Sequence, residues 1–385
     1  MKKIVIINQS AGELCRDIAN AFYEKSFDVS IICGKKCVSD LKKKLEDNVL
    51  IDTIVSYDKT STARRLATWF WGTIQIYFKI LLKYRKSNLF IVSNPPFATL
   101  LPLLLRNHYS LLIYDIFPDV LCSQNVLSDN SFIIRIWKKM NRCVYVNADF
   151  VFTIGERMKK VLEQYIPGFR IAVIPNWTDT SFIKPIPHEQ NSFIQQYGLK
   201  NKFIVLYSGN FGNTHKVEVI LDVAKRLKSN SEIQFVIIGD GNKKQLLKDT
   251  IEREKLTNCL LLPHQPYDIL PYSLTSADIG VITLDEQSSS MSVPSKTYST
   301  LASGCAVLGI ASQETDFSEL VNHYSVGMCF NSCDIDGMTS YILSLYRDKD
   351  LLNSYKKNSR TAAFDFTSQN AYQYVEPYLN EICNG

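Results

Sequence analysis

The chain has 385 residues, more than one hydrophobic core usually serves, so its length predicts two domains. Hydrophobic residues make up 46% and charged residues 21% of the composition, which is typical of a soluble globular protein; no apolar stretch is long and charge-free enough to predict a membrane span. The formal net charge of +5 is unevenly spread, because residues 1–180 hold 25 Lys and Arg against 16 Asp and Glu.

The basic first half indicates an anionic partner. No helix-turn-helix, RNP-type or zinc-finger pattern accompanies the charge, so no nucleic acid is expected. A phospholipid surface and a diphosphate-linked acceptor both fit, and plain solubilising charge is the alternative. The ten cysteines are scattered and lack nearby histidines, which favours reduced thiols and predicts no metal site.

Short β-branched runs alternate with amphipathic stretches, which is the rhythm of parallel sheets covered by helices. The N-terminal apolar run is too short for a signal peptide, and we interpret it as the first buried strand. In the first half, strands are predicted at Lys3–Ile7, Val29–Cys33, Ile51–Val55, Leu89–Ser93, Leu111–Tyr114, Phe150–Ile154 and Ile171–Ile174. The helices predicted between them are Gly12–Lys25, Thr62–Lys86, Ser131–Asn147 and Glu156–Tyr165.

The predicted helix Thr62–Lys86 has an apolar face wider than a surface helix needs. It carries Trp69, Trp71 and Phe78, and lysines and arginines flank them. Aromatic residues with flanking basic side chains suit a bilayer interface. A helix wedged into the core, or a dimer contact, is the alternative.

A proline-containing stretch from Pro175 to Pro187 predicts a linker, after which the rhythm restarts. We therefore predict an α/β protein of two Rossmann-like doubly wound domains that face each other across a cleft, with ligands at the carboxyl ends of the strands. The predicted domains span 1–175 and 176–385, and the last helix of the second domain can pack back on the first domain. In the second half, strands are predicted at Phe203–Tyr207, Gln234–Ile238, Leu260–Leu262, Ile279–Thr283 and Ala306–Ile310, and helices at Lys216–Lys228, Lys243–Glu254 and Pro294–Ala302.

Two strands of the second half run into glycine-containing turns. The first continues through Ser208-Gly209-Asn210-Phe211-Gly212, and the second ends at Gly239-Asp240-Gly241. Glycines at such turns let the backbone approach a phosphate, and the amides of a following helix favour negative charge. Each turn alone is a weak signal, because many α/β turns contain glycine for steric reasons.

A third segment is predicted to form a helix that starts at Pro294 and stops at Gly304, the usual asymmetry of helix ends. Lys296 then lies in the first turn, where the helix dipole disfavours an ammonium group unless an anion binds there. We expect Lys296 and the helix amides to share one diphosphate. An exposed lysine without a role is the alternative.

In their order and spacing, these motifs resemble family 4 retaining glycosyltransferases of GT-B fold. The resemblance spans most of residues 175–330 and rests also on Pro175-Asn176-Trp177, on Ser276-Ala277-Asp278-Ile279 and on Pro294-Ser295-Lys296. Upstream, Ser93-Asn94-Pro95-Pro96 and Tyr114-Asp115-Ile116-Phe117-Pro118-Asp119 are similar to a bacterial subgroup that builds capsule and O-antigen. The resemblance implies a retaining, metal-independent enzyme that moves a hexosyl or N-acetylhexosaminyl group from a nucleotide-diphosphate donor, a UDP-sugar being favoured.

The chain departs from the family pattern in both halves. In the first half, the family's usual histidine after a central strand is missing, and Asp115 and Asp119 occupy that neighbourhood. Met291 and Ser299 stand where the family has two glutamates that touch the donor sugar and the ribose. Asn210 and His215 stand where it has a diphosphate-binding arginine and lysine. The resemblance then implies that Lys296, with Lys216, supplies most of the positive charge.

The site implied by the resemblance has a donor part and an acceptor part. Charge on the leaving diphosphate would be stabilised by Lys296 and helix amides, and Asp115 would orient the acceptor hydroxyl or simply brace a strand end. Glu319 would reach the ribose or sugar, or cap a helix. The candidate catalytic residues are Asp115 and Lys296, and the candidate donor-binding residues are Gly209, Asn210, Gly212, His215, Asp240, Ser290, Met291, Ser295, Lys296, Ser299 and Glu319.

No cofactor is expected, since the nucleotide sugar is a substrate. The expected partners are that donor, a polyprenyl-diphosphate-linked saccharide acceptor and an anionic membrane surface, which places the protein in the cytoplasm, peripheral at the inner face of the membrane. One rival function is a non-hydrolysing nucleotide-sugar epimerase, which needs acid and base groups on both sides of the sugar. The other is a non-catalytic nucleotide-binding subunit, suggested by the missing glutamates.

Overall fold

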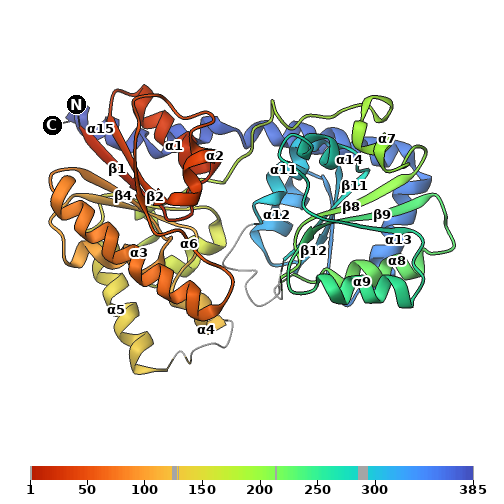
Figure 1. Ribbon diagram of the computed structural model, residues 1–385, viewed down its shortest axis with the longest axis horizontal. Coiled ribbons are helices and arrows are strands. Elements are labelled where there is room, and N and C mark those ends of the chain that lie inside the picture. The colour runs from red at the N-terminus through yellow and green to blue at the C-terminus, as the bar shows by residue number, and fades with distance from the viewer. Residues whose placement is uncertain (1, 124–127, 129, 213–214, 285–293, 385) are drawn as a thin grey trace. The chain divides into compact units, whose positions relative to one another are not determined.

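The computed structural model describes residues 2–123, 128, 130–212, 215–284 and 294–384. The chain divides into two compact units, one comprising Met1–Asn176 with Ser368–Gly385 and the other Trp177–Thr367. Each unit is a parallel sheet with helices on both faces (Figure 1). Within the described ranges, no helix is both long enough and apolar enough to cross a bilayer.

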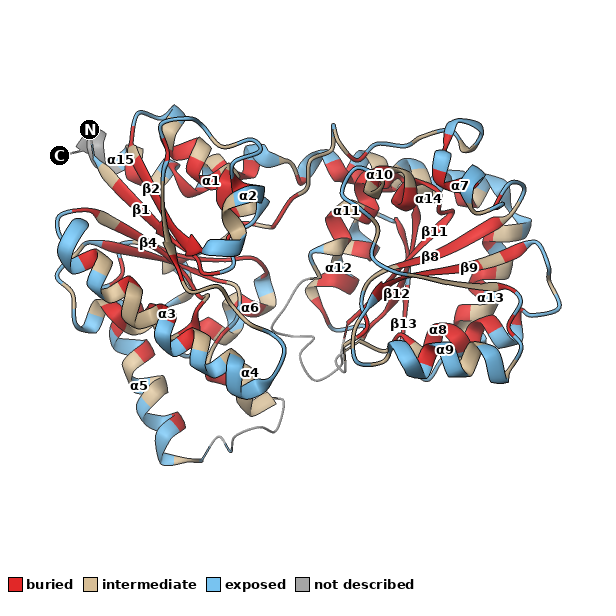
Figure 2. Cartoon of the chain, in the orientation of Figure 1, coloured by how far each residue is buried: buried red, intermediate tan, exposed pale blue. Residues whose placement is uncertain are grey.

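The first unit contains a seven-stranded sheet in the order β3-β2-β1-β4-β5-β6-β7, with every pairing parallel. Its central strands are buried on both faces (Figure 2), which accounts for their nearly continuous apolar sequence, whereas the edge strands β3 and β7 are partly exposed. The strands are β1 (Lys3–Ile7), β2 (Asp28–Gly34), β3 (Leu50–Ile54), β4 (Asn88–Val92), β5 (Tyr109–Ile113), β6 (Val151–Thr153) and β7 (Ile171–Val173). The helices are α1 (Glu13–Glu24), α2 (Val38–Leu41), α3 (Thr62–Lys83), α4 (Asp119–Ser123), α5 (Phe132–Asn147), α6 (Glu156–Leu162) and α15 (Glu376–Asn384).

The C-terminal segment 368–385 is held to the first unit by tyrosines. The Tyr374 ring packs edge-on against Phe90, and the Tyr378 ring packs edge-on against Phe22. The Tyr378 hydroxyl also donates a hydrogen bond to Ser110 Oγ at 2.6 Å. Large buried aromatic surfaces with one satisfied hydroxyl anchor a segment strongly, so this end of the chain is part of the first unit's core.

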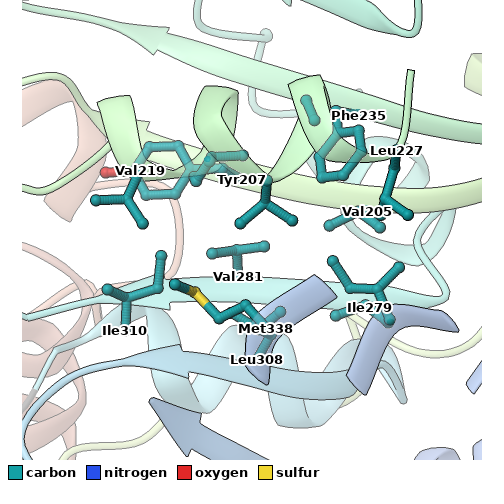
Figure 3. Close-up of a cluster of buried hydrophobic side chains, with 14 of the residues drawn as sticks. Val205, Tyr207, Val219, Leu227, Phe235, Ile279, Val281, Leu308, Ile310 and Met338 are labelled. Carbon is teal, nitrogen blue, oxygen red and sulfur yellow. The ribbon is translucent and has the colours of Figure 1, made fainter. Parts of the chain in front are cut away.

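The second unit contains a six-stranded parallel sheet in the order β10-β9-β8-β11-β12-β13. Side chains of its central strands interdigitate with those of α8 and α13 (Figure 3). The strands are β8 (Phe203–Asn210), β9 (Ile233–Asp240), β10 (Cys259–Leu262), β11 (Ile279–Thr283), β12 (Ala306–Ile310) and β13 (Gly327–Phe330). The helices are α7 (Ser192–Gln196), α8 (Glu218–Arg226), α9 (Lys244–Arg253), α10 (Leu270–Thr275), α11 (Lys296–Ser303), α12 (Asp316–His323), α13 (Ile335–Arg347) and α14 (Lys349–Ala362).

The predicted fold class, two doubly wound α/β domains, is confirmed in the architecture of each unit. Every predicted strand is present, and β13 is an additional strand that the sequence did not predict. The helix predicted from Pro294 begins two residues later, at Lys296, and Ser295 is its N-cap residue. It ends as predicted at Gly304, which has a left-handed conformation with φ of 71°. The predicted helix Thr62–Lys86 ends at Lys83.

Asp278, from the Ser-Ala-Asp-Ile motif, is a structural residue. Its buried carboxylate accepts a hydrogen bond from the backbone N–H of Ile204 in β8 at 2.9 Å and pairs with Lys356 Nζ of α14 at 3.0 Å. The side chain therefore connects the amino end of the central strand β8 to a helix that is distant in sequence. This motif stabilises the second unit and lies at the end of the sheet opposite the glycine turns.

We expect Asp278→Ala to lower the free energy of unfolding of the second unit by about 2–3 kcal/mol, because it leaves a buried backbone N–H and a partly buried ammonium without their acceptor. Urea unfolding, followed by a probe in the second unit, measures the change. Asp336→Asn is the control, since the Asp336–Arg226 pair is exposed and should contribute little. Equal midpoints for the two variants would contradict the structural role.

Candidate functional site

The second unit has one point where its strand order reverses, between β8 and β11. In doubly wound sheets, ligands bind outside the carboxyl ends of the strands at this point. Gly209 and Asn210 end β8, and Thr283 ends β11. Lys296, the first residue of α11, extends its side chain to the end of β8.

The ammonium of Lys296 is buried, and among the described residues it has no hydrogen-bond partner. It lies 4.1 Å from the centre of the Tyr207 ring, and the Tyr207 hydroxyl donates to the carbonyl oxygen of Asn210 at 2.8 Å. Burial lowers the pKa of Lys296 to about 7. An aromatic face compensates only part of the cost of burying a cation, so an anion that binds beside Lys296 would stabilise its charged form.

Gly209 makes this position of Lys296 possible. A Cβ atom added at residue 209 would lie 2.8 Å from Lys296 Nζ and 3.4 Å from the Tyr207 hydroxyl. Any other residue would therefore push the ammonium away from the strand end. The glycine that the sequence analysis assigned to close backbone approach also leaves room for the lysine.

The turn at Gly239–Gly241 packs against the turn at Gly209–Gly212. Gly241 has φ of 146°, and a Cβ there would meet Asn210 Oδ1 at 2.7 Å. The exposed carboxylate of Asp240 bonds Lys244 Nζ at 2.9 Å and the Gly241 backbone N–H at 2.8 Å, and these hydrogen bonds lower its pKa. Asp240 thus braces the turn beside Asn210, so its carboxylate is already engaged.

His215 lies on the other side of the β8 turn, where its Nδ1 is 3.4 Å from Thr283 Oγ1. Its carbonyl oxygen accepts a hydrogen bond from Lys243 Nζ at 2.8 Å, and Lys243 also bonds both carboxylate oxygens of Glu218. Lys243 and Tyr207 were not among the site residues predicted from the sequence. The position of Lys243 just before α9 was a usable signal for it, whereas nothing in the sequence pairs Tyr207 with Lys296.

The remaining donor-site candidates differ in what they do. The Ser299 hydroxyl donates to the Lys296 carbonyl oxygen at 3.0 Å, within its own helix. Ser295 is exposed and makes no side-chain cap for α11. Gly212 is half-buried near the Asn210 amide and the His215 ring. Ser290 and Met291 lie outside the described residues.

Glu319 is exposed and is the fourth residue of α12. The cap of that helix is Thr315, whose Oγ1 accepts a hydrogen bond from the Ser318 backbone N–H at 2.9 Å. The N-cap of α12 is therefore Thr315, and the roles predicted for Glu319 stay predictions.

The first unit carries the two aspartates of the upstream motif. Asp115 is exposed directly after β5, where Ser93 Oγ accepts hydrogen bonds from the backbone N–H groups of Tyr114 and Asp115. Asp119 is buried and engaged, since it pairs with Lys138 at 3.1 Å and accepts from the Tyr165 hydroxyl at 2.5 Å. Ser93 braces the strand end, which leaves the Asp115 carboxylate accessible.

The residues of this site lie in a region of the chain that is similar to known proteins. Residues 189–362 match the family model described as "Glycosyl transferases group 1". The chain is 28% identical over 223 residues to "Probable glycosyltransferase WbjE" of Pseudomonas aeruginosa, which covers 56% of this chain and 54% of that protein. It is 27% identical over 200 residues to "Putative colanic acid biosynthesis glycosyl transferase WcaI" of Escherichia coli (strain K12), which covers 51% and 49% of the two chains. The chain thus spans about half the length of the curated relatives it matches.

Among solved structures, the chain is similar to Anabaena Alr3699/HepE in complex with UDP, with a TM-score of 0.75, 14% identity, and coverage of 99% of this chain and 100% of that one. At this identity the likeness concerns the fold. The protein accordingly has the GT-B fold of two parallel-sheet α/β domains.

We expect the Lys296 amine to titrate near pH 7, so that it is mostly neutral at pH 8 and charged below pH 6, in contrast to an exposed lysine. NMR of ¹³C-methylated lysines measures the titration, and the signal missing from Lys296→Arg assigns it. Added pyrophosphate should raise this pKa, because an anion favours the charged form. A Lys296 pKa near 10, unchanged by pyrophosphate, would contradict the described environment.

Proposed function

We propose that the chain is a glycosyltransferase that moves a sugar from a nucleotide-diphosphate donor to a lipid-linked saccharide acceptor in bacterial surface polysaccharide synthesis. The observation that carries this proposal is the buried ammonium of Lys296, which no described residue pairs with, at the point where the strand order of the second unit reverses. The match of residues 189–362 to a glycosyltransferase family model supports the same conclusion.

In the proposed reaction the nucleotide diphosphate departs from the anomeric carbon, and the enzyme must stabilise the charge that develops on it. Lys296 supplies a cation at the strand end, and the first backbone N–H groups of α11 add their dipole. Gly209 leaves the backbone open to a phosphate, and Asn210 and His215 supply hydrogen-bonding side chains beside it. We propose that the transfer proceeds without metal or cofactor and with retention of configuration.

We propose a UDP-sugar as the donor, since HepE, a structural neighbour, was solved with UDP. The proposed acceptor site lies in the first unit, where Asp115 is exposed at the carboxyl end of β5 and would orient the acceptor hydroxyl. Surface polysaccharide synthesis is supported by WcaI, whose name refers to colanic acid biosynthesis.

One observation favours a second candidate, a non-catalytic nucleotide-binding subunit. Ser299 stands where the family has a glutamate, and its single O–H is already donated to the Lys296 carbonyl oxygen, so it offers the ribose no carboxylate and no free donor. Sugar transfer or donor hydrolysis above background by purified protein would separate the enzyme from this alternative.

We expect Lys296→Ala to weaken binding of UDP-glucose or the preferred donor by roughly 10- to 100-fold, because it removes a charge-assisted contact of about 1.5–3 kcal/mol. Calorimetric titration at pH 6.5 measures the loss. In the wild type, affinity should also fall as the pH rises above 7, since the free lysine is then neutral and must take up a proton on binding.

Lys244→Ala is the matched control for this experiment, because Lys244 is a nearby exposed lysine whose ammonium already pairs with Asp240. It should retain wild-type affinity. Lys296→Arg should bind without the pH dependence, since arginine stays charged. Wild-type affinity in a folded Lys296→Ala protein would refute the assignment.

We further propose that the first unit works at an anionic membrane surface, with the protein peripheral at the cytoplasmic face. The α3 helix exposes large apolar side chains, among them Phe70 at 60%, Trp71 at 57% and Leu82 at 85%. Lys83 ends this helix, and Arg85 and Lys86 follow it. Interfacial helices combine such apolar burial with attraction to anionic lipid.

We expect the protein to co-sediment with vesicles of anionic phospholipid at low salt, and to do so less at high salt, because salt screens the basic side chains. Phe70→Ser with Leu82→Gln should reduce binding at every salt concentration, since it removes apolar area that enters the interface. Ser192→Ala, in the second unit, is a control. Protein that stays in the supernatant with every vesicle composition would refute membrane binding.

A further inference from the structure

A groove of about 680 Å³ lies in the first unit between the edge strand β3 and the helix α3. Its volume is in the range of small-molecule sites. The strand contributes Thr53 to the wall, Val55 directly after it adds to the same side, and the helix contributes Trp71, Ile74 and Phe78. Lys35, which follows β2, completes the rim.

The helix wall of the groove is an apolar stripe that the core does not use. On α3 the buried stripe is made by Trp69, Gly72, Ile76 and Ile80. Trp71, Ile74 and Phe78 follow the i, i+3, i+7 spacing of a separate helix face. Trp71 and Phe78 remain more than half exposed, so two aromatic rings line a space that no described residue fills.

The groove lies at the carboxyl edge of the first sheet. Lys35 directly follows β2, which ends at Gly34, while Val55 directly follows β3, which ends at Ile54. Ligands of doubly wound sheets bind outside this edge. The groove is therefore on the side of the unit that also carries Asp115, at the end of β5.

The rim of the groove is positively charged. Lys35 is exposed and has no ion pair with any described residue. On the helix side, Lys79 Nζ is 3.9 Å from Asp52 Oδ1, but that carboxylate is held more closely by Lys83 at 2.9 Å and by the Tyr84 hydroxyl. Lys79 and Lys83 share the single Asp52 carboxylate, so the rim keeps a net positive charge. An apolar wall beneath such a rim complements an amphiphile with an anionic head and a hydrocarbon tail.

We propose that this groove binds the hydrocarbon chain of a single phosphorylated lipid, with the phosphate at Lys35 and Lys79. Apolar contact with Trp71, Ile74 and Phe78 supplies most of the affinity, because each CH₂ group of the chain that leaves water adds to the binding free energy. The inference rests on the proposed function in so far as this lipid is the carrier of the acceptor saccharide. Uptake of one lipid chain in the groove is a different event from adhesion of the helix surface to a bilayer.

The test is calorimetric titration of the full chain with farnesyl phosphate below its critical micelle concentration, with farnesol and inorganic phosphate as separate arms. We expect farnesyl phosphate to bind, farnesol to bind at least fivefold more weakly, and inorganic phosphate alone not to compete. Thr53→Phe should weaken farnesyl phosphate at least tenfold by filling the groove. Lys35→Gln should reduce farnesyl phosphate toward the affinity of farnesol.

Leu82→Gln is the matched control, because Leu82 is exposed on α3 outside the groove lining. It should keep wild-type affinity for the monomeric lipid while weakening vesicle binding. Val55→Phe fills the same groove from a second position and tests it should Thr53→Phe fail to fold. No binding of farnesyl phosphate, wild-type binding in a folded groove-filling variant, or competition by inorganic phosphate alone would each overturn the proposal.

A titration of the same samples with UDP separates this result from the proposed function. The filling variants alter only the first unit, so UDP should bind them as it binds the wild type. Farnesyl phosphate binding without UDP binding would support the lipid groove and refute the donor site. UDP binding without farnesyl phosphate binding would do the reverse.

Discussion

The ammonium of Lys296 has been taken out of water without a counter-ion among the described residues, and much of the second unit is arranged around it. A pKa lowered from 10.5 to about 7 corresponds to a penalty on the order of 5 kcal/mol for the charged form. The Tyr207 ring offsets about 2 kcal/mol of such a penalty at best. The burial penalty exceeds the stabilisation by the ring, so without a bound anion the Lys296 amine is neutral or its charged form is poorly stabilised. A diphosphate that enters this site converts that penalty into binding energy, so the lysine contributes most where the ligand is anionic.

This arrangement depends on residues that come from separate parts of the sequence. Tyr207 is fixed by the core of the second unit (Figure 3), Gly209 two residues later leaves room for the ammonium, and α11 delivers the lysine across the sheet. Gly239 extends the same constraint to β9, because a Cβ there would lie 1.9 Å from the Gly209 carbonyl oxygen. The glycines of both turns therefore serve the packing of the two strands and the lysine, in addition to any phosphate that the backbone admits.

Sequence periodicity was sufficient for the strands, because buried parallel strands are apolar along their whole length and stand out from amphipathic helices. The exception, β13, reads Gly-Met-Cys-Phe and has no β-branched residue, so it lacks that signal. Lys296 could be predicted from its place in the first turn of a helix, which is a local property. Its aromatic partner Tyr207 could not, since the two residues are 89 positions apart and only the sheet topology brings them together. Asp278 was taken as part of a family motif, and its contact with Lys356 gives the physical reason for an aspartate at that position.

The wide apolar face of α3 divides into a buried part and an exposed part. The sequence left open whether this helix packs into the core, forms a dimer contact or faces a bilayer, and the buried part packs in the core of the first unit. Trp69 and Ile76 are buried, while Trp71 and Phe78 are exposed beside the groove. The two units differ in which interaction would supply the affinity for an anionic ligand. In the second, the proposed diphosphate would bind mainly through its charge, because the Lys296 ammonium is buried and its interactions are little screened by salt. In the first, Lys35 is exposed, so its attraction for a phosphate is weak and apolar contact must supply the affinity. A soluble donor would be selected by its diphosphate, and a lipid ligand by its chain.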